Sequence, residues 1–120
     1  MTMKTISVNA IDVYVVDLHE AVSFYIGILG LEDCGESAPG HMCRAGDLHI
    51  YLQGGCTPRY PDREACGICP VLGAESITSM RDHLAAHGVL ISGFKVYSDE
   101  FAMFKFTDPS GNSLAFAGPP

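Results

Sequence analysis

Apolar and polar residues alternate first as in a strand and then as in a helix. Residues 6–16 are rich in β-branched and apolar side chains, which predicts a strand. Apolar residues then recur at helical spacing over about 18–29. Asp17, with Glu20 three residues later, is typical of a helix start, and Gly30 stands where a left-handed C-cap belongs. This stretch therefore predicts a strand followed by a capped helix.

Three short strands are predicted after this helix. Residues 48–53 alternate between apolar and polar, which places His49 and Tyr51 on the same face of a strand. Residues 32–37 and 41–45 carry weaker strand patterns. The first half of the chain thus predicts the order β-α-β-β-β.

The same order returns in the second half. Residues 54–64 are rich in glycine, proline and charge, which predicts a linker. We expect modules at about 6–53 and 65–117, in a single domain over residues 1–120. The second module is predicted to hold a strand at 65–72, a helix ended by Gly88, and strands at 89–97, 101–107 and 113–117, the last two joined by a turn at 108–112.

Composition excludes several classes of protein. The chain has 120 residues, 48% of them hydrophobic, which suits one folded domain. The net charge of −7 and the absence of a basic cluster argue against nucleic-acid binding. The sequence lacks an apolar run of membrane-spanning length, and its first residues lack the apolar core of a signal peptide. We therefore expect a cytoplasmic protein with no nucleic-acid or membrane partner.

Cysteine and histidine patterns point to no known catalytic motif. Five cysteines without a signal peptide argue against a disulfide framework. Cys66 and Cys69 would point to opposite faces of a strand, so they do not predict a shared metal, and we expect them to be buried, unreactive thiols. His83 and His87 are interpreted as a solvated helix face. No catalytic residue is identified.

Two motifs resemble a known superfamily. Phe24-Tyr25 followed by Leu29-Gly30-Leu31, and the later Phe106-Thr-Asp-Pro-Ser-Gly-Asn112, are similar to the module patterns of the vicinal oxygen chelate proteins, which include glyoxalases, bleomycin resistance proteins and dioxygenases. The resemblance covers about residues 6–117. It implies an α+β fold in which two βαβββ modules form a curved mixed sheet around a cavity.

Metal-dependent members of that superfamily hold a divalent ion in the cavity, and the resemblance implies where the ligands would stand. The positions fall at Ala10, at Ile50 or Tyr51, at Ile68 or Cys69, and at Ala115. Alanine and isoleucine carry no donor atom. We therefore expect no metal or other cofactor, with a site rebuilt from His41, Cys43 and His49 as the alternative.

The alternation of side chains along each strand predicts which residues line the cavity. Asp12 and Tyr14 share the face of Ala10. Residues of the last two strands join them if Thr107 pairs with Ser113. The predicted ligand-binding residues are Asp12, Tyr14, His49, Tyr51, Met103, Lys105 and Ala115. The alternative is that these side chains only fill a barrel.

Three functions remain open at this point. The first is a metal-free protein that binds a small organic molecule, cationic or aromatic, as the antibiotic-sequestering members of the superfamily do. The second is a glyoxalase-like lyase or isomerase, or a dioxygenase, with non-standard metal ligands. The third is a structural or regulatory role. We also expect a homodimer, because pairing two such chains buries further apolar surface.

Overall fold

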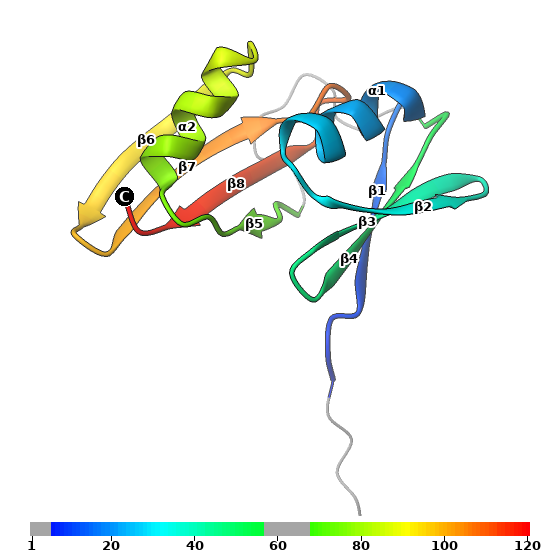
Figure 1. The fold of residues 1–120 in the computed structure, drawn as a ribbon, viewed down its shortest axis with the longest axis horizontal. Helices are drawn as coiled ribbons and strands as arrows, with labels where there is room; N and C mark the ends of the chain where they lie inside the picture. Colours follow the sequence, from blue (N-terminus) through cyan, green and yellow to red (C-terminus); the bar gives the residue numbers. More distant parts are fainter. Residues whose placement is uncertain (1–5, 57–67) are drawn as a thin grey trace, which may run out of the picture.

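The computed structural model describes residues 6–56 and 68–120, and these form two units of the same design (Figure 1). Each unit has one strand, one helical segment and three further strands, so the two predicted βαβββ modules are confirmed. Module 1 comprises β1 (Ala10–Tyr14), α1 (Leu18–Val22), the π-helical turn η1 (Ser23–Ile28), β2 (Glu32–Ser37), β3 (Gly40–Ala45) and β4 (Leu48–Gln53). Module 2 comprises β5 (Val71–Leu72), α2 (Ile77–Ala86), β6 (Ile91–Ser98), β7 (Phe101–Thr107) and β8 (Ser113–Gly118).

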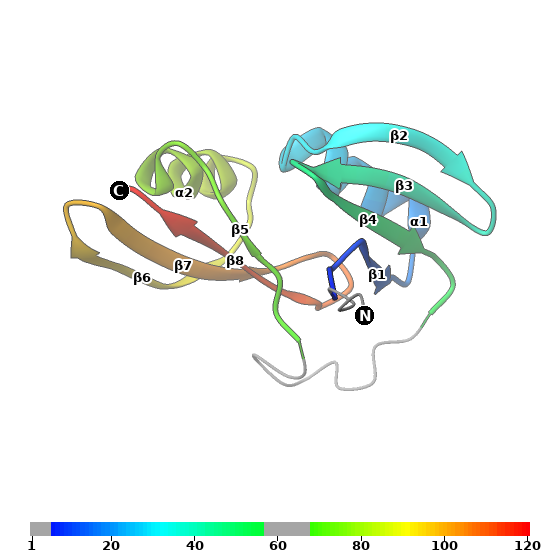
Figure 2. The same ribbon diagram turned by 90° about the horizontal axis from the view of Figure 1, so that it is seen from below.

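The strands form two mixed sheets of four strands each. Sheet 1 has the order β1-β4-β3-β2, and sheet 2 has the order β5-β8-β7-β6. In each sheet the first strand of the module pairs in parallel with the last, and the other pairs are antiparallel. Figure 2 shows that the two sheets remain separate. The α+β fold is as predicted, but one chain does not close its sheets around a cavity.

Helix boundaries follow the signals in the sequence. The Asp17 carboxylate accepts a hydrogen bond from the Glu20 backbone amide at 3.0 Å and so caps α1. Gly30 and Gly88 have φ values of 82° and 78°, the left-handed conformation that glycine adopts without strain. Among the described residues, no helix is long and apolar enough to cross a membrane.

Two strands are shorter than predicted. The first covers Ala10–Tyr14 rather than 6–16, because β4, its partner among the described strands, offers residues 48–53. The strand predicted at 65–72 is seen only at Val71–Leu72, with residues 65–67 outside the described range. Most of the predicted linker 54–64 also lies outside that range.

A shared hydrophobic core joins the modules. Phe24 of η1 packs against Phe106 of β7, with ring centroids 6.2 Å apart. Beside it, the Tyr25 hydroxyl donates a hydrogen bond of 2.8 Å to the buried carboxyl group of Asp108. Figure 1 shows the helices of the two modules lying near each other, with the sheets extending away from them. The helices and the β7–β8 turn therefore fix one module against the other.

Candidate functional site

Each sheet has one face packed against helices and one face without a helix, which we call the open face. On β1 and β4 of sheet 1, Ile11, Val13, Ile50 and Leu52 pack into the core. Ala10 pairs with His49, and Asp12 pairs with Tyr51, so these four residues and Tyr14 share the open face. The structure thus places Asp12, Tyr14, His49 and Tyr51 together on one surface.

The sheet 2 residues also share one surface. Thr107 pairs with Ser113, which is the register required for Met103 and Lys105 to share a face with Ala115. Lys105 then lies opposite Ala115, and Met103 lies opposite Ala117, on the open face of sheet 2. Lys105 is exposed, Met103 is half-buried and Ala115 is buried.

Within one chain the two sets of residues do not meet. Asp12 and Tyr14 border a cavity of about 150 Å³ beside the start of β8 that includes no predicted site residue of sheet 2. Lys105 lines a different cavity of about 240 Å³, between the end of β7 and the start of β6. A binding site made from all seven predicted residues therefore needs the open faces of two sheets brought together.

The polar groups on the open faces differ in their freedom to bind a ligand. The Asp12 carboxylate is exposed and forms no hydrogen bond among residues 6–56 and 68–120. Tyr51 donates its hydroxyl to the Ser37 carbonyl at 2.7 Å, which holds its ring over Gly40. On sheet 2, Lys95 lies over the Tyr97 ring at 4.8 Å. Asp12 is thus a carboxylate on the open face of sheet 1 that is available to a cation.

Side chains at the expected metal positions do not fit a divalent ion. Ala10 and Ala115 end in a methyl group. Ile50 is buried against the core, so the fourth-strand position on the open face belongs to Tyr51. Ile68 is 85% exposed and has no donor atom, and the alternative at this position, Cys69, is half-buried with its thiol donating to the Pro70 carbonyl at 3.8 Å. Among the described residues, no three His, Cys, Asp or Glu side chains lie close enough to hold a metal.

A metal site built from His41, Cys43 and His49 is also not formed. Cys43 is buried on the helix-covered face, where its thiol donates to the Ile50 carbonyl at 3.3 Å. Burial raises the pKa of Cys43 to about 12, so the thiol stays protonated. His41 shares that face, whereas His49 lies on the open face. The three donors are therefore divided between two sides of one sheet.

The expectation of a buried thiol holds only in part for Cys69, which is half-buried. Of the other cysteines, Cys43 is buried and Cys56 is half-buried, whereas Cys34 is exposed, because β2 is an edge strand with a bulge at this point. Cys66 lies outside the described residues.

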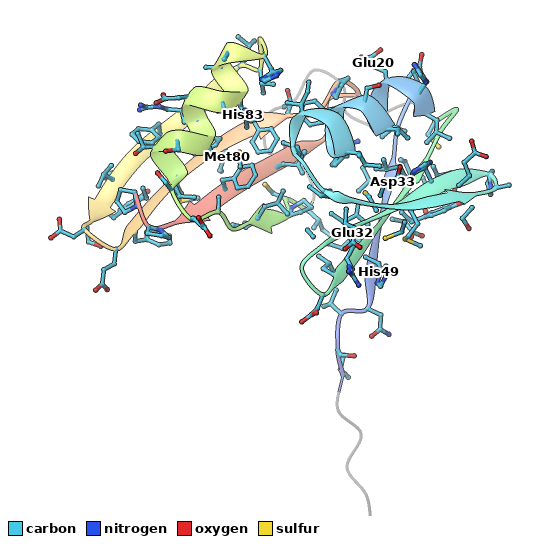
Figure 3. The ribbon with its side chains drawn as sticks, in the orientation of Figure 1. Glu20, Glu32, Asp33, His49, Met80 and His83 are labelled. Atoms are coloured by element: carbon cyan, nitrogen blue, oxygen red, sulfur yellow. The ribbon has the colours of Figure 1, made fainter. Side chains whose placement is uncertain are left out.

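The predicted helix histidines have a contact that periodicity did not indicate. His83 and His87 are exposed, as expected for a solvated helix face. However, His83 Nε2 lies 2.8 Å from the Ile28 carbonyl oxygen, which links α2 to the end of η1 (Figure 3).

The sequence patterns did not predict the side-chain contacts that connect the two modules. Asp108 accepts hydrogen bonds from Tyr25 and from the backbone amides of Ser110 and Asn112. Asn112 donates its side-chain amide to Asp108 and to the Tyr14 carbonyl, each at 2.9 Å. The sequence signal was the 108–112 turn, which indicated a local bend but not its partners.

Comparison with solved structures identifies the fold. A protein from Bacillus anthracis whose name assigns it to the glyoxalase family superposes with a TM-score of 0.77 at 17% identity, covering 100% of both chains. TnmS3, an antibiotic-binding protein from Streptomyces sp. CB03234, gives 0.74 at 21% identity, covering 99% of this chain and 100% of its own. This chain has the vicinal oxygen chelate fold.

Other relatives of this fold are enzymes. A lactoylglutathione lyase from Agrobacterium tumefaciens superposes with a TM-score of 0.70 at 18% identity over 92% of each chain. No protein-family model matches the sequence, and no curated protein matches it. At these identities the likeness concerns the fold, and the same fold carries binding proteins and enzymes.

Proposed function

We propose that this protein binds a small organic molecule without a metal ion, between the open faces of its sheets. The observation that carries the proposal is the pair Ala10 and Ala115, which puts methyl groups at two positions where the metal-dependent relatives carry ligands. The small, exposed side chain of Ala10 leaves room for a larger ligand, and sequestration needs affinity but no chemistry. The antibiotic-binding neighbour supports this reading, because its name describes binding alone.

A second copy of the chain completes the site in this proposal. The open faces of one chain do not line a common cavity, whereas sheet 1 of one copy can face sheet 2 of another. Strands β1 and β5 each have one unpaired edge among the described elements. Large apolar residues next to these edges and on the open faces are exposed: Ile6, Val8, Tyr14, Val16, Ile68, Val71, Tyr97 and Phe101. Such surface on a small protein is typical of an interface, and two-fold pairing is the commonest arrangement.

The chemistry of the two faces defines the ligand class. Sheet 1 contributes the Asp12 carboxylate and the rings of Tyr14 and Tyr51, and sheet 2 contributes Met103 and Lys105. Tyrosine rings and a methionine offer flat, polarisable contact for an aromatic body. An unpaired carboxylate offers a partner for a positive group. The ligand is therefore an aromatic or cationic organic compound.

A ligand screen in the presence of EDTA tests the proposal. Aromatic and cationic antibiotics are added to the purified protein, and the melting temperature is followed. Hits are then titrated by calorimetry. We expect at least one compound to bind with EDTA present and to lose affinity in Asp12→Asn and Lys105→Met variants, while Asp99→Asn, an exposed control in the β6–β7 turn, binds normally. Binding that requires added divalent metal would reject the proposal.

A further inference from the structure

A separate cavity lies on the other side of sheet 1. It has a volume of about 550 Å³ and opens between the first turn of α1 and the β2–β3 hairpin. Its walls are formed by Leu18, His19, Val22, Glu36, Ala38, Pro39, Gly40 and His41. None of the seven residues of the open-face site lines it. Any ligand bound here would occupy the helix-covered side of the sheet.

One wall of this cavity holds a histidine in a fixed orientation. His41 Nε2 lies 2.7 Å from an Asp33 oxygen, and the same oxygen accepts the Gly35 backbone amide at 2.8 Å. The hydrogen bond from His41, and next the one from Gly35, lowers the pKa of Asp33, so this carboxylate is ionised at neutral pH and can only accept. Nε2 is therefore the donor in this hydrogen bond, and in the neutral imidazole Nδ1 is the nitrogen that can accept one.

A free carboxylate lies next to this histidine. Glu36 pairs with His41 across the β2–β3 ladder, so both side chains project on the same side of the sheet. Glu36 is exposed and forms no hydrogen bond or ion pair within the described part of the chain. The cavity thus brings a free carboxylate and the ring of His41 close together.

The remaining walls are mostly apolar. Leu18 and Val22 come from α1, and Ala38 and Pro39 come from the hairpin. Together they can cover the hydrocarbon part of a ligand, while its polar end stays beside Glu36. A cavity of this volume is within the size range of small-molecule sites.

We propose that this cavity binds a small organic amine with an apolar body. The ammonium group pairs with Glu36 and donates a hydrogen bond to Nδ1 of His41, and the body packs on Leu18 and Val22. The net charge of −7 favours the approach of a cation. The site is independent of the open-face function, and either can exist without the other.

Benzylamine is a suitable probe, with benzyl alcohol as its neutral analogue. Each is titrated into ¹⁵N-labelled protein, and amide chemical shifts are followed by NMR. We expect benzylamine to shift the amides of Leu18, Val22, Gly40 and His41 with a Kd of about 1 mM, roughly 4 kcal/mol of binding free energy. Benzyl alcohol should bind at least fivefold more weakly, because it carries no charge.

Four substitutions locate the binding. Glu36→Gln should weaken benzylamine binding at least fivefold, whereas Glu100→Gln, the same change at an exposed residue of the β6–β7 turn, should leave it unchanged. Val22→Phe should block the cavity and abolish the shifts. Equal weakening by the two glutamate variants, or equal binding of the alcohol and the amine, would overturn the proposal. Loss of binding in Asp12→Asn would place the amine on the open face and would also overturn it.

Discussion

The hydrogen bond between Tyr25 and Asp108 should be a main stabilising contact between the modules, and Tyr25→Phe tests this. The substitution removes only the hydroxyl, so the ring keeps its packing against Phe24, whose centroid lies 5.4 Å away. Burial, and next the charge of Asp108, raises the pKa of Tyr25, so the hydroxyl stays protonated and donates. In the variant, Asp108 keeps its hydrogen bonds from Ser110 and Asn112 but loses the one that comes from module 1.

The size of the effect follows from the geometry. Tyr25 is fully buried and Asp108 is 4% exposed, so water cannot replace the lost donor. A hydrogen bond to a charged group contributes about 1.5–3 kcal/mol. For a domain of 120 residues, 1 kcal/mol lowers the melting temperature by about 4 °C, so Tyr25→Phe should lower it by about 6–12 °C.

Thermal and urea unfolding at one fixed protein concentration measure this directly. Tyr14→Phe is the matched control, because the Tyr14 side chain is 52% exposed and its hydroxyl has no hydrogen bond among the described residues. We expect the control to change the free energy of unfolding by less than about 0.5 kcal/mol. If Tyr25→Phe is no less stable than Tyr14→Phe, the contact does not hold the modules together and the reasoning fails.

Three further predictions concern the site and the thiols. Asp12→Asn should reduce ligand affinity by about 1–3 kcal/mol with an unchanged melting temperature, because Asp12 is exposed and unbonded in the described structure, and equal affinity in calorimetry would reject its role. Protein purified without added ions should contain no stoichiometric metal, and elemental analysis that finds about one transition metal per chain would contradict this. Iodoacetamide at pH 8 should modify the exposed Cys34 quickly and leave Cys43 unmodified, since burial keeps Cys43 neutral up to a pKa of about 12, and peptide mass spectrometry that finds Cys43 labelled as fast as Cys34 would contradict the buried placement.

The sequence predicted those features that depend on local spacing. Strands β4 and β7 have the predicted bounds, because the alternation of apolar and polar residues over 48–53 and 101–107 indicates which face of the strand packs against the core. Helix ends were predicted for a similar reason, since a glycine at position 30 or 88 marks a left-handed residue. The turn at 108–112 was also predicted, and Thr107 and Ser113, which flank it, pair in the structure.

What the sequence left open depends on contacts between distant parts of the chain. Tyr25 and Asp108 are 83 residues apart, and the sequence around one of them does not indicate that it contacts the other. The length of β1 is limited by its partner β4, which β-propensity does not report. The contact of His83 with Ile28 likewise depends on how α2 lies beside η1. Whether the open faces of two sheets meet depends on how sheets pack against each other, so alternation alone could not decide it.

The most direct test of the central claim is a mixed dimer of two variant chains. Asp12→Asn alters sheet 1 and Lys105→Met alters sheet 2, and each homodimer should bind the selected ligand weakly at every site. If each site joins sheet 1 of one copy to sheet 2 of the other, the purified heterodimer has one doubly altered site and one intact site. We therefore predict that calorimetry in the presence of EDTA finds one site of wild-type affinity per heterodimer. A heterodimer that binds as weakly as both homodimers would contradict the account.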